Sequence, residues 1–203
     1  MTEPEQRGDR DGPGLHDIHD RLIRRTELPR TAVSDVLDGI ICRIGAVCSW
    51  LWPVVVAVIV ISVIARYVFS TGSVMMEEIQ WHIAAIAWLV GLSYTLTTDS
   101  HVRVDVLHER FGPRTQAWIE LFGILLLLLP FAIIAFWESV PFFLSSFGQN
   151  ERSQAPGGLP ARWLVKFFVP FSFALLTVAG FSRLLRCSAL LFGLPRPNDR
   201  NGE

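Results

Sequence analysis

The sequence predicts an all-α integral membrane protein with four transmembrane helices and both termini in the cytoplasm. About half of the 203 residues are hydrophobic (51%), 18% are charged and the mean hydropathy is +0.39, which is more apolar than a soluble domain of this length. The apolar residues gather in four long runs. Basic residues gather in three flanks: before the first run, between the second and third runs, and after the fourth. The formal net charge of −1 gives no electrostatic reason to expect a nucleic-acid partner.

The chain is expected to consist of a membrane domain between two cytoplasmic tails. Residues 1–33 mix acidic, basic, Gly and Pro residues with little aromatic content, which predicts disorder. Residues 34–193 form the predicted four-helix membrane domain, and residues 194–203 form a short second tail. Apolar residues between positions 15 and 22 recur at helical spacing beside arginines, so a helix lying on an anionic membrane surface and a solvated basic tail remain equal alternatives.

Four apolar runs are long enough to cross a bilayer, since about 20 helical residues span its hydrocarbon core. The predicted spans are approximately 40–66, 77–98, 117–147 and 163–186. Pro53 lies inside the first span and is expected to kink it, an event that membrane helices tolerate. The third span is longer than a perpendicular crossing requires, so it must tilt or continue along the membrane interface.

Basic residues in the short flanks of the spans determine the predicted orientation. The N-terminal flank, the connection after the second span and the C-terminal flank carry Arg24, Arg25, Arg30, Arg43, Arg103, Arg110, Arg114, Arg183, Arg186 and Arg196. The two opposite connections carry both acidic and basic residues. Because the more basic flanks stay in the cytoplasm, both termini are predicted to be cytoplasmic.

Ionisable residues within or beside a span are candidate functional residues, because a charge in lipid is costly unless a partner compensates it. Arg66 and Glu78 are separated by a short connection, and we expect them to pair and to fix how the first two spans meet. Helix capping and interface placement explain Glu77 and Glu78 equally well. Glu138 is expected near the outer end of the third span, where snorkelling towards the headgroups would explain it.

His82 lies one helical turn after Glu78, a spacing that also suits a proton relay or a b-type haem ligand. A haem held by two histidines needs a second histidine at membrane depth, whereas His101 and His108 lie in the predicted cytoplasmic connection. The three cysteines form no CxxC motif and no Cys/His cluster. We therefore expect no cofactor, no metal site and no catalytic residue.

The second span carries a stripe of small residues at helical spacing. Ala84, Ala87 and Gly91 lie on one side of this helix, followed by Thr95 and Thr98. Small residues let two helix backbones approach closely in lipid, where no hydrophobic effect drives helix association. The stripe therefore predicts that this helix lies at a protein contact.

The segment 99–105 is unusually charged for residues that directly follow a transmembrane helix. If it is helical, His101 and Asp105 share a face at i,i+4 spacing, and Arg103 lies on another side. There Arg103 would reach lipid phosphates or a neighbouring subunit. An ordinary basic cytoplasmic loop explains the segment equally well.

The chain resembles a known family at several of these positions. The residues are Arg66-Tyr67-Val68-Phe69, the pair Glu77-Glu78, Gly91, and His101-Val102-Arg103-Val104-Asp105. Their order and spacing resemble the small membrane subunit of tripartite ATP-independent periplasmic (TRAP) transporters, the DctQ-type family, over residues 36–192. One departure is a methionine, Met75 or Met76, where the family commonly has a tryptophan before the paired glutamates.

The resemblance implies a four-helix subunit of the bacterial inner membrane that contacts membrane lipids and supports a large permease subunit. In such systems a periplasmic binding protein captures an organic acid, and the large subunit carries it together with sodium ions. The residues agree with this division of labour. Transport sites are usually built from broken helices and midplane polar groups, and in this sequence we find neither, since the charges stay at the edges of the spans. Two other classes remain open: a membrane anchor subunit of a respiratory complex, with haem, and a stand-alone exporter.

Overall fold

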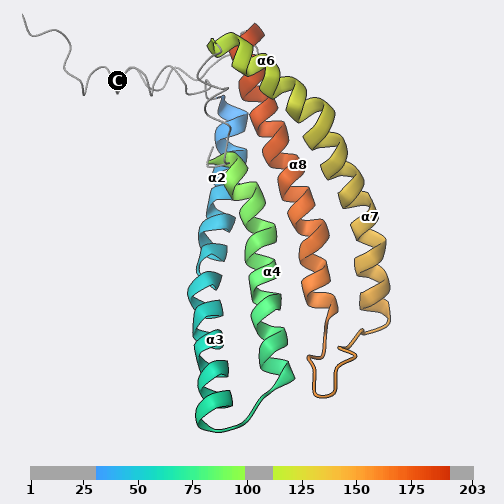
Figure 1. The fold of residues 1–203 in the computed structure, drawn as a ribbon. Helices are drawn as coiled ribbons and strands as arrows, with labels where there is room; N and C mark the ends of the chain where they lie inside the picture. Colours follow the sequence, from blue (N-terminus) through green and yellow to red (C-terminus); the bar gives the residue numbers. More distant parts are fainter. Residues whose placement is uncertain (1–30, 99–111, 193–203) are drawn as a thin grey trace, which may run out of the picture.

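The computed structural model describes residues 31–98 and 112–192, and this part of the chain is helical apart from short connections (Figure 1). The helices are α2 (Ala32–Ser49), α3 (Leu51–Val68), α4 (Val74–Thr97), α6 (Pro113–Gly123), α7 (Leu129–Gly148) and α8 (Trp163–Phe192). A π-helical turn, η1 (Ile124–Leu128), joins α6 to α7. The prediction of an all-α protein with four membrane-spanning helices is confirmed for the described residues.

The candidate spans are longer than the sequence predicts. They comprise Ala32–Val68, Val74–Thr97, Arg114–Gly148 and Trp163–Phe192. The first begins inside the segment predicted as a tail, because the Thr31 side chain accepts from the Ser34 N–H while the Ser34 hydroxyl accepts from the Thr31 N–H. Such a capping box is a strong helix start. The rest of both predicted tails, residues 1–30 and 194–203, lies outside the described residues, as does residue 193.

Consecutive spans run in opposite directions, so the bundle has two ends (Figure 1). At the basal end α2, α6 and the C-terminal part of α8 meet the end of α4; at the loop end lie the connections 69–73 and 149–162. Helix α8 is central, since it packs against α2, α4, α6 and α7, whereas α3 packs mainly against α4. The helices therefore lie side by side in the order α3, α4, α8 and α7. At the basal end α2 packs against both α4 and α8.

The first span is interrupted at Trp50, between α2 and α3. Pro53 lies three residues further on, and it has no N–H to give to the carbonyl of Ser49. The Trp50 N–H instead bonds to the carbonyl of Val47 at 3.2 Å, and the Ser49 hydroxyl bonds to that of Ala46 at 2.7 Å. The interruption at Trp50 therefore has its cause in Pro53.

The third span contains a π-helical turn immediately before Pro130. A proline within a helix leaves an earlier carbonyl without its donor, and a π-helical turn is one way to accommodate the change. This turn places Leu128 and Leu129 close to Gly180 of α8: a Cβ at Gly180 would lie 3.1 and 3.3 Å from their methyl carbons. Gly180 thus allows the close approach of α7 and α8.

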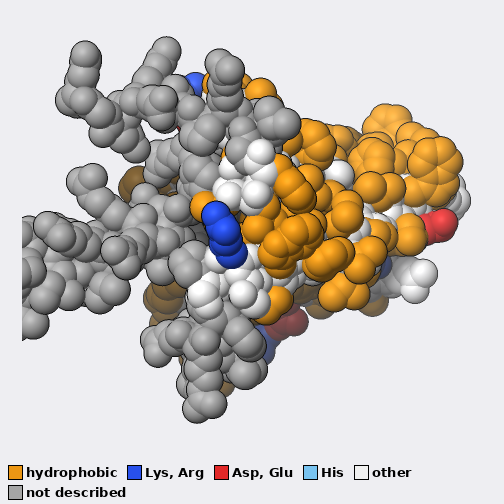
Figure 2. Space-filling view, turned by 90° about the horizontal axis from the view of Figure 1, so that it is seen from above, with side chains coloured by type: hydrophobic (Ala, Val, Ile, Leu, Met, Phe, Trp, Pro, Cys, Tyr) orange, Lys and Arg blue, Asp and Glu red, His pale blue; other side chains and the backbone are white. Residues whose placement is uncertain are grey.

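Most of the apolar surface of the bundle is exposed. Large side chains such as Val56, Ile64, Trp88 and Trp137 are 46–74% exposed, whereas the buried residues are mostly small. Viewed from the basal end, hydrophobic side chains cover much of the visible described surface and few charged side chains lie among them (Figure 2). A surface of this composition requires lipid or another apolar protein surface around it.

Candidate functional site

Two adjacent glutamates near the start of α4, Glu77 and Glu78, face different partners. Arg66, near the end of α3, forms an ion pair with Glu77, and both side chains are about half exposed. The predicted pair between Arg66 and Glu78 is therefore wrong. Adjacent residues of a helix lie about 100° apart, so Glu77 faces α3 while Glu78 points into the bundle, where it is buried.

Glu78 holds the connection 149–162 against α4. Its carboxylate accepts a hydrogen bond from the Leu159 N–H at 2.6 Å and another from the Ser153 hydroxyl. The Ser153 N–H in turn donates to the Leu159 carbonyl at 3.1 Å, which closes the loop on itself. A Cβ at Gly158 would lie 2.9 Å from the carboxylate, so this loop needs glycine at its closest approach to Glu78.

A second carboxylate fixes the ends of the same connection. Glu151 forms an ion pair with Lys166 of α8 and accepts a hydrogen bond from the Ser146 hydroxyl of α7 at 2.6 Å. The Lys166 hydrogen bond, followed by that of Ser146, holds the pKa of the Glu151 carboxyl below its usual value. We call Glu78, Ser146, Glu151, Ser153, Leu159 and Lys166 the loop clamp. It joins α4, α7 and α8 at the loop end.

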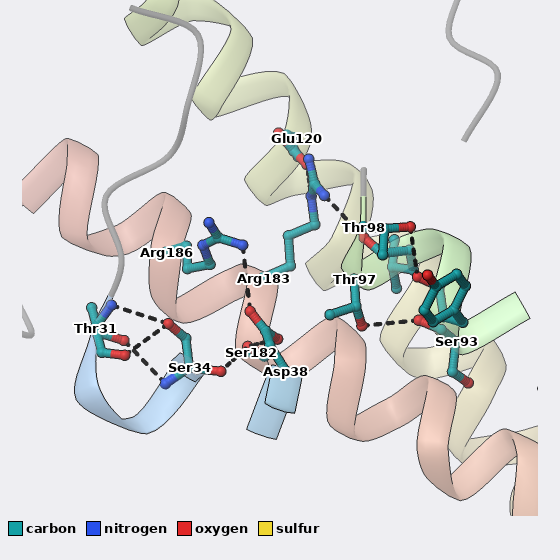
Figure 3. A network of polar contacts seen from close by, with 12 residues as sticks. Thr31, Ser34, Asp38, Ser93, Thr97, Thr98, Glu120, Ser182, Arg183 and Arg186 are labelled. Carbon is teal, nitrogen blue, oxygen red and sulfur yellow. Dashed lines mark hydrogen bonds and ion pairs between the residues drawn. The ribbon is translucent and has the colours of Figure 1, made fainter. Parts of the chain in front are cut away.

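Figure 3 shows a network of polar side chains at the basal end. Arg183 of α8 is 5% exposed; it forms an ion pair with Glu120 of α6 and donates to the Leu96 carbonyl of α4 at 3.0 Å. Asp38 of α2 accepts from the Ser182 hydroxyl at 2.6 Å and from Arg186 at 3.4 Å. We call Asp38, Glu120, Ser182, Arg183 and Arg186 the basal network. It ties α2, α4 and α6 to the central helix.

The sequence missed both clusters as helix-to-helix contacts. It used Arg183 and Arg186 only as basic flank residues that orient the spans. One available signal was that Glu120 and Arg183 are opposite charges at the same predicted side of two apolar spans. Charges that share a depth in the membrane tend to pair with each other.

The small-residue stripe on α4 lies partly against the chain itself. Ala87 is buried at 4% exposure, whereas Ala84 and Gly91 are partly exposed, and a Cβ built on Gly91 would meet no atom within 4 Å. Gly91 therefore makes no close helix contact within the described residues. Helix α4 does approach α2 closely at Tyr94, whose Cγ would lie 2.7 Å from a Cβ at Gly45 of α2.

His82 is buried beneath the loop clamp. Its Nδ1 lies 2.6 Å from the Glu78 carbonyl oxygen, so this nitrogen serves as the donor of a bond within the helix. Among the described residues no group of His, Cys, Asp and Glu side chains could hold a metal ion. Three further candidate residues, His101, Arg103 and Asp105, lie outside the described residues.

Glu138 does not lie where the sequence places it. Helix α7 continues to Gly148, ten residues beyond Glu138, which corresponds to about 15 Å of helix. The expectation that Glu138 lies near the outer end of its span is therefore wrong. Its side chain is exposed on the surface of the bundle.

The described residues thus form a four-helix integral membrane protein whose interhelical ion pairs lie towards the two ends of the bundle. The chain belongs to the family of tripartite ATP-independent periplasmic transporters, DctQ component, whose family model matches residues 55–190. The match runs from α3 to near the end of α8, and it confirms the family resemblance at the level of the small permease subunit. The respiratory anchor is not favoured by this result.

Searches of curated proteins and of solved structures return no match to this chain.

Proposed function

We propose that the chain is the scaffold subunit of a TRAP-type transporter, which holds a large permease subunit in the membrane. In this proposal the large subunit carries an organic acid together with sodium ions, and a periplasmic binding protein delivers the acid. Family membership supports this assignment. The observation that carries the scaffold role is that most of the large exposed side chains of the spans are apolar while the interhelical ion pairs lie towards the two ends.

The proposed location is the bacterial inner membrane, with the basal end and both termini in the cytoplasm. The basic flanks of the sequence support this orientation through the positive-inside rule. The loop clamp would then face the periplasm, and the basal network would lie at the cytoplasmic boundary. Lipid headgroups would surround both ends.

The stripe of Ala84, Ala87 and Gly91 is the proposed contact with the large subunit. Gly91 supports this role because it presents backbone without a side chain on a partly exposed side of α4, where a second helix could approach closely. A leucine at this position would prevent that approach. Because a Cβ there meets no atom of the described residues within 4 Å, the fold of this subunit should tolerate the change.

Reconstituted sodium-driven uptake tests the proposal, with the large subunit and the binding protein present. Four preparations are compared: the wild type, Gly91→Leu, Gly123→Leu and no small subunit. Gly123 is a matched control, since it also lies in an apolar span and also has open space at its Cβ, but lies outside the stripe.

We expect uptake and copurification of the large subunit to fall for Gly91→Leu and to stay near the wild-type level for Gly123→Leu. Affinity of the binding protein for its solute should be the same in all four preparations. Full uptake without this chain would refute the scaffold role. Equal losses for both leucine variants would refute the contact at the stripe while leaving the scaffold role in place.

A further inference from the structure

Glu138 is a carboxylate on an otherwise apolar, exposed face of α7. Phe131, Ile134 and Phe142 lie one or two helical turns from it on the same side of the helix and are 61%, 63% and 51% exposed. Glu138 itself is exposed and has no hydrogen bond or ion pair within the described residues. We call these four residues the Glu138 face.

The depth of Glu138 follows from the polar clusters at the two ends of the same span. Ser146, which belongs to the loop clamp, lies eight residues after Glu138, and this separation corresponds to about 12 Å of helix. Glu120, which belongs to the basal network, lies 18 residues before it, or about 27 Å. Glu138 therefore lies within the apolar segment, more than two helical turns from the nearer polar cluster.

The carboxylate cannot reach the nearer polar layer by extending along the helix. Side chains of an α-helix tilt towards its N-terminus, and the N-terminus of α7 points to the basal end (Figure 1). The Glu138 side chain therefore inclines away from the loop end and deeper into the apolar segment. Snorkelling to the near headgroups, which the sequence suggested, does not explain this residue.

An exposed carboxylate at this depth indicates a contact with protein, because hydrocarbon chains offer no donor or cation. A second copy of this chain is a poor partner. The described Lys and Arg of the spans lie near the loop end (Arg66, Lys166) or in the basal part of the bundle (Arg43, Arg114, Arg183, Arg186). Two copies packed through this face would therefore bring none of these described cations to Glu138.

We infer that the Glu138 face docks a transmembrane helix of the large permease subunit, and that this helix presents Lys or Arg at the depth of Glu138. The inference rests on the proposed function and adds a second contact, on α7, to the one proposed on α4. The aromatic and aliphatic side chains around Glu138 would pack against the partner helix and exclude lipid from the ion pair.

Site-specific photo-crosslinking locates the partner. The photoreactive residue p-benzoylphenylalanine replaces either Ile134, on the Glu138 face, or Ile133, its matched control; both isoleucines are more than half exposed and lie at nearly the same depth. Successive residues are 100° apart on a helix, so Ile133 points further away from Glu138. We expect the large subunit to crosslink severalfold more from Ile134 than from Ile133.

Association of the two subunits in liposomes, measured by energy transfer between labelled subunits, tests the charge. We expect Glu138→Gln to weaken association by roughly 3- to 20-fold, the range that interhelical polar contacts reach in membranes. Glu138→Lys should weaken association further. Changing the Lys or Arg of the crosslinked partner helix to Glu should then restore association with Glu138→Lys. Unchanged helicity and elution of each variant would exclude misfolding.

The outcomes separate this inference from the scaffold proposal. If wild-type subunits fail to associate, the proposed function fails. If they associate but Glu138→Gln and Glu138→Lys bind as the wild type does, only the docking at this face is refuted. Crosslinks from Ile134 to lipid alone, to a second copy of this chain, or no more efficient than those from Ile133 would also overturn it.

Discussion

Replacing Arg183 with methionine should destabilise the bundle more than any comparable change to an exposed ion pair. Arg183→Met keeps a long apolar stem but removes the ion pair with Glu120 and the hydrogen bond to the Leu96 carbonyl. Breaking a buried ion pair costs about 3–5 kcal/mol in soluble proteins, whereas interhelical polar contacts in membranes reach about 1.7 kcal/mol. Because Arg183 is buried but Glu120 is partly exposed, we expect a loss of about 2–3 kcal/mol.

The free energy of unfolding in detergent micelles measures this loss, with Arg66→Met as the matched control. Arg66 forms the same type of pair with Glu77, but both side chains are about half exposed, so its removal should cost less than about 1 kcal/mol. Glu120→Gln and the double variant complete a cycle whose coupling free energy should be about 1–2 kcal/mol. A loss for Arg183→Met no larger than that for Arg66→Met, or a coupling near zero, would refute the reasoning.

Further predictions concern helix contact, the loop clamp and topology. Gly45→Ala should destabilise the fold by about 1–3 kcal/mol because its Cβ meets Tyr94; Gly39→Ala in the same helix has open space and should be neutral or stabilising, so equal effects in thermal unfolding would contradict this packing. The lowered pKa of Glu151 means that the loop clamp gains stability above the unfolded value near 4.5 and loses it as pH falls through the folded value. Amide protection in residues 149–162, expressed relative to the intrinsic exchange rate at each pH, should therefore fall at acid pH in the wild type, and a Glu151→Gln variant with the same pH response would argue against this role. In a cysteine-free background, Gln149→Cys should react with an impermeant thiol reagent from the periplasm and Thr115→Cys should not; the reverse labelling pattern would invert the topology.

Hydropathy was sufficient to predict the four helices, because an apolar run of membrane-spanning length has few alternatives to a helix. The ends of the helices were less predictable. The capping box of Thr31 and Ser34 extends the first helix into a segment whose composition suggests a tail, since a local pair of hydrogen bonds outweighs average polarity. The interruption at Trp50 was foreseeable, because Pro53 acts on the turn that precedes it.

Partners between helices could not be predicted from spacing alone. The sequence paired Arg66 with Glu78, but the 100° step between neighbouring residues assigns Arg66 to Glu77 and leaves Glu78 for loop residues 75 and 81 positions further along the chain. The direction in which each helix faces depends on tertiary packing around α8, which no single span encodes. The same limit applies to Gly91, which belongs to a small-residue stripe and yet makes no close contact within the described residues.

The two polar clusters and the Glu138 face have opposite relations to the apolar segment. Glu78, Glu151 and Asp38 each accept hydrogen bonds from groups of this chain, so their charges need no further partner to be stable. Glu138 lies deeper than any of them and accepts none within the described residues. A chain that satisfies the carboxylates at its two ends internally and leaves one exposed at membrane depth has its missing donor on another molecule. For a subunit of a multi-protein transporter, the large permease is the molecule in which that donor should be sought.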